Sequence, residues 1–155
     1  MFGAWRVDDV AGVEAAHEAG AAFVLGDVAD RDMVIYSNRH SLPFYAAATT
    51  PLEVRAVLDL GATGAMLWPA DVVGHVMAGH LARVGLAEKV IPMGGMGAFA
   101  AGEWLKHGAP AACVDTTLLG DAPDGGDLGL LRDRCGSFRK AMQRAVEARA
   151  EKSAG

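Results

Sequence analysis

The chain contains 155 residues, of which 52% are hydrophobic and 21% are charged, and its formal net charge is -5. This length suits one domain with a substantial core, and the acidic balance argues against an electrostatic nucleic-acid surface. The N-terminal residues lack the basic and apolar segments of a signal peptide, and no run of about 18 apolar residues occurs. The two cysteines lack CxxC spacing, so we expect a reduced, cytoplasmic protein without a membrane or nucleic-acid partner.

Short apolar runs alternate with helical stripes along the chain. The apolar runs predict strands at residues 2–7, 23–25, 42–45, 65–68, 90–93 and 111–114. Helices are expected from Asp8 or Asp9 to Gly20, at 51–60, 72–84 and 99–106, and from 128 onward, with a short helical turn at 30–33 before an apolar run at 34–36. The clearest helix start is Thr50, which precedes proline and is followed three residues later by glutamate.

Three predicted helices end in a Gly-Ala pair that is followed within a few residues by an apolar strand. The pairs begin at Gly20, Gly61 and Gly108. A unit of helix, glycine and buried strand that recurs at roughly 40 to 50 residues predicts right-handed βα units on a parallel sheet. This periodicity leaves open whether the sheet is open or closed into a barrel.

The segment GATGAMLWPAD at 61–71 joins a helix end, an uncharged strand and a proline. A strand that is apolar on both faces is typical of a sheet covered on both sides, so we expect Trp68 in the core. Pro69 cannot continue the hydrogen-bonded ladder, and a loop is expected from Ala70 and Asp71. In α/β barrels the chemistry is done at this carboxyl end of the strands.

Polar residues are predicted at several strand ends, namely Arg6, Asp27, Asp71, Asp115 and Thr116. As a site, Arg6 would bind an anionic group, and Asp115 or Asp27 would be an acid, a base or a metal ligand. Alternatively, Asp27 and Asp71 cap the following helices. Asp115 is predicted inside a strand, where aspartate is disfavoured, and an ion pair with Arg6 would also explain it.

Histidines and basic residues in the second half have two interpretations each. His75 is predicted near the rim of the strand ends and could act in acid/base chemistry, whereas His80, five residues later, falls on another face. Both could instead be ordinary helix residues, and without a third ligand we expect no metal and no cofactor. The arginines and lysines of the last helix are interpreted as a solvated basic face.

Five motifs in order make the chain similar to the KDPG/KHG aldolases. They are AGAAFVLG at 19–26, TTPLEV at 49–54, GATGAMLWPAD at 61–71, IPMGG at 91–95 and the predicted strand CVDTTLL at 113–119. Members of this family are class I lyases that release pyruvate and an aldehyde, with a TIM-barrel fold that is commonly trimeric. The resemblance implies that this chain begins near the third strand and lacks the first two βα units.

We therefore predict an incomplete α/β TIM barrel of about six parallel strands, with one domain over residues 1–150 and a frayed tail over 151–155. A barrel without two strands has two exposed edges, and such edges pair with other chains unless they are covered. We expect a homo-oligomer, a dimer or a trimer, that covers these edges.

The resemblance also implies changes at the site. Met66 stands where the family has its Schiff-base lysine, and a thioether cannot form an imine. In the family a Gly-Gly turn and a Gly-Ser pair hold a phosphate. Gly94 and Gly95 remain, Thr116 can replace the serine, and Asp115 stands at the preceding glycine, where a carboxylate would repel a phosphate. Alone, the Gly-Gly pair is equally consistent with a tight turn.

The predicted site residues divide into two groups. The catalytic group is Asp115, Arg6, Asp27 and His75, and the substrate-binding group is Gly94, Gly95, Thr116, Met66 and Thr50. One hypothesis is a diverged lyase-type enzyme that acts on a small carboxylate or 2-oxo acid without a Schiff-base lysine. Another is a non-catalytic relic that oligomerises or binds a ligand. A third is a misplaced gene start, with upstream sequence supplying the missing strands.

Overall fold

The structure is a computed structural model that describes the backbone of residues 1–154 and the side chains of residues 1–151. Its internal contacts divide the chain into two compact units, residues 1–68 and the residues from Pro69 onward. Each unit is described by itself below, and the single domain over 1–150 stays a prediction. The last helix extends to Ala154, and the remainder of the predicted tail, Gly155, lies outside the described residues.

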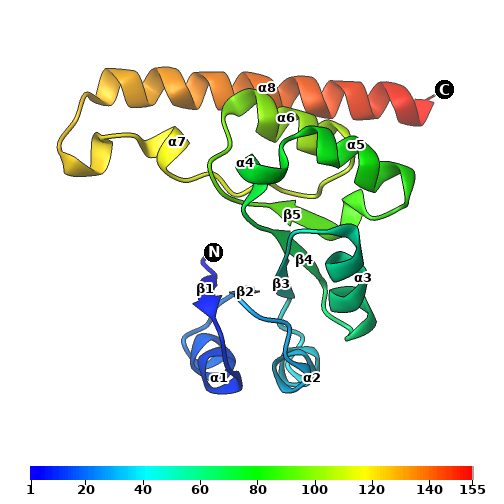
Figure 1. Ribbon diagram of the computed structural model, residues 1–155. Coiled ribbons are helices and arrows are strands. Elements are labelled where there is room, and N and C mark those ends of the chain that lie inside the picture. Colours follow the sequence, from blue (N-terminus) through cyan, green and yellow to red (C-terminus); the bar gives the residue numbers. More distant parts are fainter. Residues whose placement is uncertain (155) are drawn as a thin grey trace. The chain divides into compact units, whose positions relative to one another are not determined.

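The first unit alternates strands and helices (Figure 1). Its strands are β1 (Ala4–Val7), β2 (Val24–Gly26), β3 (Phe44–Ala48) and β4 (Gly64–Leu67), and its helices are α1 (Val10–Glu18), α2 (Arg31–Arg39) and α3 (Pro51–Asp59). The strands pair in parallel and in chain order, β1 with β2, β2 with β3, and β3 with β4. This order confirms the predicted α/β class and is the strand order of a (β/α) barrel wall.

Helix ends in this unit follow the local chemistry of the sequence. The Asp9 carboxylate accepts a hydrogen bond from the Gly12 amide at 2.7 Å and so caps α1. Asp30 caps α2 in the same way, which replaces the predicted role of Asp27 as a cap. Helix α2 also continues through the apolar run at 34–36, because that run and the residues around it form one amphipathic stripe.

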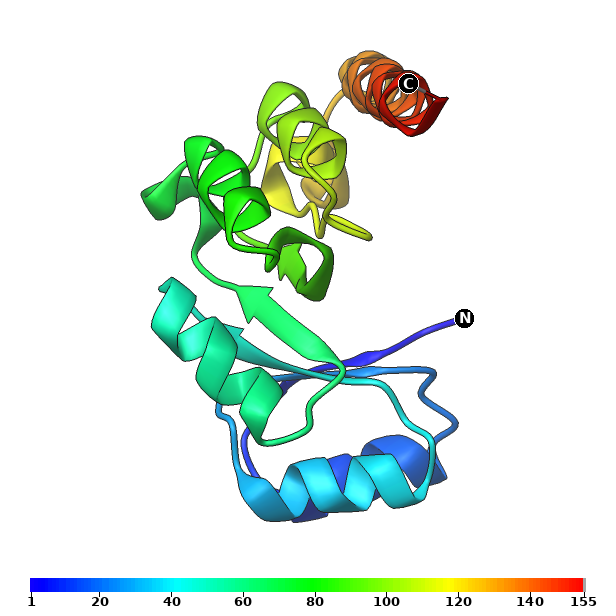
Figure 2. The same ribbon diagram turned by 90° about the vertical axis from the view of Figure 1, so that its right-hand side faces the viewer.

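Strand β4 lies in the core, as its uncharged sequence predicts. All four of its residues are buried, and the Met66 side chain is only 1% exposed. In Figure 2, α1 and α2 lie beside one another, and α3 packs against β3 and β4. The prediction that Trp68 is a core residue is wrong: the strand has ended, and its side chain is 49% exposed.

The second unit is mostly helical. Its elements are α4 (Ala70–Val73), α5 (Val76–Arg83), the 3₁₀ helix η1 (Ala87–Lys89), β5 (Val90–Pro92), α6 (Ala98–Lys106), α7 (Thr116–Leu119), the 3₁₀ helix η2 (Ala122–Asp124) and α8 (Leu128–Ala154). The helix expected at 72–84 is divided at Gly74, whose φ of 75° is a left-handed conformation that glycine adopts without strain. The residues after Pro69 form the short helix α4 and not a loop.

The last predicted strand is reduced to one bridge. Met93 and Cys113 form an isolated parallel bridge, and the Cys113 amide donates to the Pro92 carbonyl at 2.9 Å. Residues 116–119, expected to continue this strand, form α7 because the amides of 118 and 119 donate to the Asp115 carbonyl and the Gly120 amide donates to the Thr116 carbonyl. Five strands are therefore formed in the described residues, where about six were expected.

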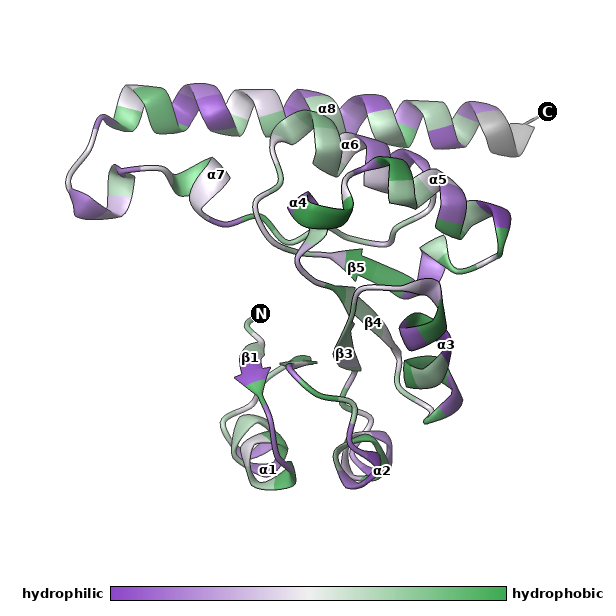
Figure 3. Ribbon diagram, in the orientation of Figure 1, coloured by the Kyte–Doolittle hydropathy of each residue, from purple (hydrophilic) through white to green (hydrophobic). Residues whose placement is uncertain are grey.

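Helix α8 packs along α6 (Figure 1). Phe138 and Ala145 are buried, and Gly102 of α6 lets Ala141 approach so closely that a Cβ on Gly102 would lie 3.3 Å from the Ala141 methyl group. Figure 3 shows hydrophilic and hydrophobic residues alternating along α8, as expected for a helix with one buried stripe. Among the described residues, no helix combines the length and apolarity needed to cross a membrane.

Candidate functional site

Two charged side chains meet at the carboxyl ends of β1 and β2. The ladder pairs Trp5 with Leu25 and Val7 with Gly26, so Arg6 is an extra residue on β1. Its φ of 61° is left-handed, which costs a residue with a Cβ about 1–2 kcal/mol. This bulge places the Arg6 Nε atom 3.6 Å from Oδ2 of Asp27.

The Arg6–Asp27 pair remains accessible to solvent. The two side chains are 70% and 42% exposed. An ion pair this exposed contributes at most about 1 kcal/mol, so a ligand can displace it at little cost. The centre of the Trp5 ring lies 6.0 Å from the Arg6 guanidinium carbon, and within the described residues the terminal nitrogens of Arg6 make no hydrogen bond or ion pair. These nitrogens can therefore bind a carboxylate in a bidentate manner.

Thr50 has a structural role in the first unit. Its hydroxyl oxygen accepts from the Glu53 amide at 3.3 Å and donates to the Glu53 carboxylate at 3.0 Å. That carboxylate also accepts from the amides of Thr49 and Thr50 at 2.8 Å and 2.7 Å. These hydrogen bonds hold the pKa of Glu53 below its usual range, with the largest effect from the Thr49 amide and smaller effects from the amide and hydroxyl of Thr50. Thr50 therefore begins α3 through a capping box.

In the second unit, a tight turn links β5 to α6. Gly94 and Gly95 have φ values of 101° and 60°. The Gly94 carbonyl accepts from the Asp71 amide at 3.2 Å, and the Asp71 carboxylate contacts Gly95 so closely that it occupies the place of a Cβ there. Asp71 lies inside α4, where Oδ1 accepts from the Val72 amide at 3.0 Å, so it is not the residue that precedes the helix.

Asp115 lies just before α7, and the prediction that it is part of a strand is wrong. The Thr116 hydroxyl donates to its carboxylate at 3.4 Å, and the neighbouring Thr117 hydroxyl donates to the Met96 carbonyl at 2.5 Å. Thr117 was missed from the sequence because nothing marks which of two adjacent threonines faces the glycine turn. Burial, and secondarily the Asp115 carboxylate, raise the pKa of the Cys113 thiol.

His75 is half-buried at the start of α5. Its ring meets the Phe99 ring edge-on, with centroids 5.1 Å apart. His75, His80 and His107 line a small hollow of about 270 Å³ between α5 and α6. His107 uses Nδ1 to bond the Glu103 carbonyl at 2.8 Å. Among the described residues, no three His, Cys, Asp or Glu side chains are grouped to hold a metal ion.

The predicted site residues thus form small groups within each unit. Arg6 and Asp27 are paired, and Met66 lies buried in β4 of the same unit. In the second unit, Asp115 contacts Thr116. Gly94 and Gly95 form a turn whose neighbour is Asp71, a residue considered from the sequence as a helix cap.

Comparison with known proteins identifies a family that most of the chain matches. Residues 1–127 match the family model described as KDPG and KHG aldolase. A 2-dehydro-3-deoxy-phosphogluconate aldolase of Treponema pallidum (strain Nichols) is 27% identical over 120 residues, which are 77% of this chain and 57% of that protein. The chain therefore spans little more than half of this curated relative.

Solved structures match the fold. A native KDPGal structure aligns with a TM-score of 0.75 at 19% identity, over 94% of this chain and 69% of that chain. The 2-keto-3-deoxy-6-phosphogluconate aldolase of Zymomonas mobilis ZM4, solved with 3-phosphoglycerate, aligns with a TM-score of 0.64 at 18% identity, over 92% and 65%. At these identities the match supports the incomplete barrel fold alone.

Proposed function

The chain belongs to the KDPG and KHG aldolase family, and on this premise we propose that it is a diverged lyase-type enzyme that acts on a small carboxylate or 2-oxo acid without a Schiff-base lysine. The observation that carries the proposal is Met66, which is 1% exposed in β4. A thioether forms no imine, and the lysines of the chain begin only at Lys89.

Arg6 and Asp27 supply the chemistry in this proposal. The terminal nitrogens of Arg6 bind the carboxylate of the 2-oxo acid, and the Asp27 carboxylate accepts a proton from the carbon next to the ketone. The electron pair left on that carbon forms an enolate, whose charge lies partly on the ketone oxygen and is stabilised by the nearby guanidinium. Return of the proton from Asp27 regenerates the substrate and the enzyme.

The remaining predicted residues have supporting roles in the proposal. Within the second unit, Gly94 and Gly95 keep their predicted binding role because their backbone amides can donate hydrogen bonds, and Asp115, Thr116 and His75 keep theirs as polar groups. The Asp71 carboxylate beside Gly95 disfavours a phosphate dianion at this turn, because like charges repel. This carboxylate therefore argues against a phosphorylated substrate at the glycine turn.

Hydrogen exchange into pyruvate in D₂O tests the proton transfer. We expect the wild-type protein to accelerate loss of the methyl proton signal in NMR, Asp27→Asn to abolish the acceleration, and Arg6→Gln to weaken pyruvate binding. Asp32→Asn, an exposed carboxylate on α2, is the matched control and should retain exchange. An exchange rate equal to that of buffer would contradict the proposal.

Borohydride reduction tests the absence of an imine. Incubation with pyruvate and borohydride should leave the protein mass unchanged, because the amine that would trap the ketone is lacking in β4. A covalent adduct on any lysine would overturn the lysine-independent proposal. The mass spectrum of the digested protein would identify the lysine.

A second candidate function is association without catalysis, and the β1 strand supports it. This strand is an outer strand of the sheet, and Phe2 and Trp5 next to its edge are 56% and 53% exposed. Exposed aromatic residues at a strand edge favour pairing with another chain. Sedimentation velocity should show a dimer or a trimer that Trp5→Glu dissociates, whereas Leu52→Glu, 76% exposed on α3, should leave it intact.

A further inference from the structure

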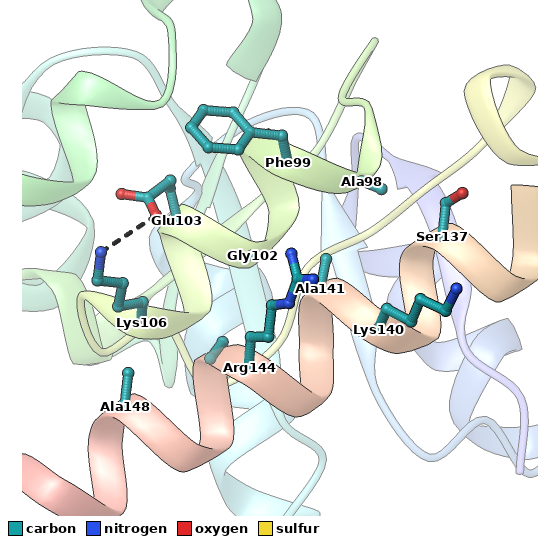
Figure 4. A pocket seen from close by; sticks show the side chains of 11 residues that line it. Ala98, Phe99, Gly102, Glu103, Lys106, Ser137, Lys140, Ala141, Arg144 and Ala148 are labelled. Atoms are coloured by element: carbon teal, nitrogen blue, oxygen red, sulfur yellow. Dashed lines mark hydrogen bonds and ion pairs between the residues drawn. The ribbon is translucent and has the colours of Figure 1, made fainter.

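A groove runs between α6 and α8, within the second unit (Figure 4). Its volume is about 550 Å³, within the range of small-molecule sites. Small residues line it, because Gly102 on α6 and the alanines at 141, 145 and 148 on α8 bring the two backbones close together. The side chains of the two helices therefore leave this space unfilled.

Cationic side chains line the groove. Figure 4 shows Lys140 and Arg144 on the α8 side and a pair formed by Glu103 and Lys106, 3.3 Å apart, on the α6 side. Lys140 and Arg144 have no ion-pair partner among the residues that the structure describes. The lining thus contains one carboxylate and three cationic side chains, on a chain whose formal net charge is -5. Such a concentration of positive charge favours an anionic ligand.

An exposed aromatic ring stands at the same groove. The Phe99 side chain is 68% exposed, although Trp104 on the same helix is fully buried. The edge-on contact with His75, at 5.1 Å between ring centroids, fixes one side of the Phe99 ring. A flat apolar group that covers Phe99 would remove apolar surface from water, and this burial is favourable.

We propose that this groove is a binding site for an amphipathic anion, a ligand with a phosphate or carboxylate at one end and a flat ring at the other. Lys140 and Arg144 bind the anionic end, and Phe99 and the alanines of α8 contact the ring. The α8 side of the groove lies beyond residues 1–127, the part matched by the aldolase family. None of the residues assigned to proton transfer lines this groove.

Titration with 1-naphthyl phosphate tests the site on the full chain. Calorimetry should show binding that is at least about tenfold tighter than that of inorganic phosphate, which lacks the ring, or of 1-naphthol, which lacks the charge. Equal affinity for inorganic phosphate would reduce the groove to a basic patch and contradict the proposal. Equal affinity for 1-naphthol would contradict the role of the cations.

Matched variants locate the binding. The double variant Lys140→Gln, Arg144→Gln should weaken binding about tenfold or more. The double variant Arg132→Gln, Arg139→Gln removes the same charge from another face of α8 and should change affinity by less than about twofold. An equal loss of 1-naphthyl phosphate affinity in the two double variants would overturn the proposal.

An independent measurement uses the unaltered protein. With methyl-labelled alanine, 1-naphthyl phosphate should shift the signals of Ala141, Ala145 and Ala148, which line the groove. Ala46 and Ala48 in β3 should be unaffected. Shifts confined to β3, or no shifts at all, would exclude the groove as the site, even where a charge variant fails to fold.

Discussion

The carboxylate of Asp71 occupies the space next to Gly95 that a side chain at that position would need. A Cβ built on Gly95 would overlap this carboxylate, and the φ of Gly95 is 60°. Two independent requirements therefore select glycine here, the left-handed backbone and the close approach of Asp71. The turn after β5 and the start of α4 are consequently one packed element.

Gly95→Ala should lower the free energy of unfolding by about 2–4 kcal/mol, because backbone strain and steric overlap add. Gly85→Ala is the control, since Gly85 has a φ of 71° and no atom within 4 Å of a built Cβ. Gly85→Ala should lower the free energy of unfolding by only about 1 kcal/mol. In urea denaturation, the double variant Gly95→Ala, Asp71→Ala should regain the part of the lost unfolding free energy that comes from steric overlap. If the free-energy losses of the two single variants simply add in the double variant, the carboxylate is not the obstacle.

Arg6 is held in a left-handed conformation that glycine would adopt more easily. Arg6→Gly and Arg6→Ala both remove the ion pair with Asp27, so their difference isolates the backbone. We expect Arg6→Gly to be more stable than Arg6→Ala by about 1 kcal/mol in thermal or urea unfolding. The reverse order would mean that β1 has no bulge at this position. A confirmed difference would mean that the chain tolerates backbone strain at this position in order to present the Arg6 guanidinium to solvent.

The capping box of α3 predicts a stability change with pH. Because the pKa of Glu53 is below its ordinary value of 4.5, its contribution is present above that value and is lost as pH falls through the lowered pKa. Glu53→Gln should therefore be less stable than wild type at neutral pH, with the difference shrinking on acidification. A difference that does not depend on pH would contradict the role of the charge.

Thr50→Ala tests the other half of the box. It should cost about 1 kcal/mol at neutral pH, because the Glu53 amide loses its acceptor. Leu52→Ala, at a position 76% exposed in the same turn, should change stability by less than about 0.5 kcal/mol. An unchanged stability in Thr50→Ala would leave Thr50 free for the substrate-binding role predicted from the sequence.

Local chemistry made much of the fold predictable from the sequence. The proline and glutamate after Thr50 specify a helix start, and the uncharged residues around Met66 specify a buried strand, because each signal is complete within a few residues. The exposure of Trp68 could not be predicted in this way. Its residue type favours burial, and only the three-dimensional end of β4 decides otherwise.

The candidate site was less predictable than the fold. Arg6 and Asp27 were each expected at a strand end, but their pairing depends on the bulge in β1, which has no glycine to indicate it. Asp115 was assigned to a strand because an apolar run precedes it, whereas hydrogen bonds from the amides of 118 and 119 to its carbonyl start a helix. The Arg6–Asp27 contact joins residues far apart in the sequence and leaves no local pattern, and the four residues of α7 are too few to show a helical one.

The position of Asp115 makes the reactivity of Cys113 a test of this part of the structure. Burial, and secondarily the Asp115 carboxylate, raise the pKa of the Cys113 thiol above its ordinary value of 9.0. Because the thiolate is the reactive form, Cys113 should react with a disulfide reagent more slowly than the exposed Cys135. The rates are measured separately in Cys135→Ser and Cys113→Ser.

Asp115→Asn removes one of the two causes of the raised Cys113 pKa, the carboxylate charge, and retains the other, burial of the thiol. In the Cys135→Ser background it should speed the reaction of Cys113 and shift the rate profile to lower pH, while the carboxamide keeps the size of the side chain. The raised pKa also means that stability should fall as pH rises through the titration of this thiol, since the unfolded chain ionises first. If Asp115→Asn leaves the rate profile unchanged, the carboxylate does not face Cys113, and its placement at the start of α7 is wrong.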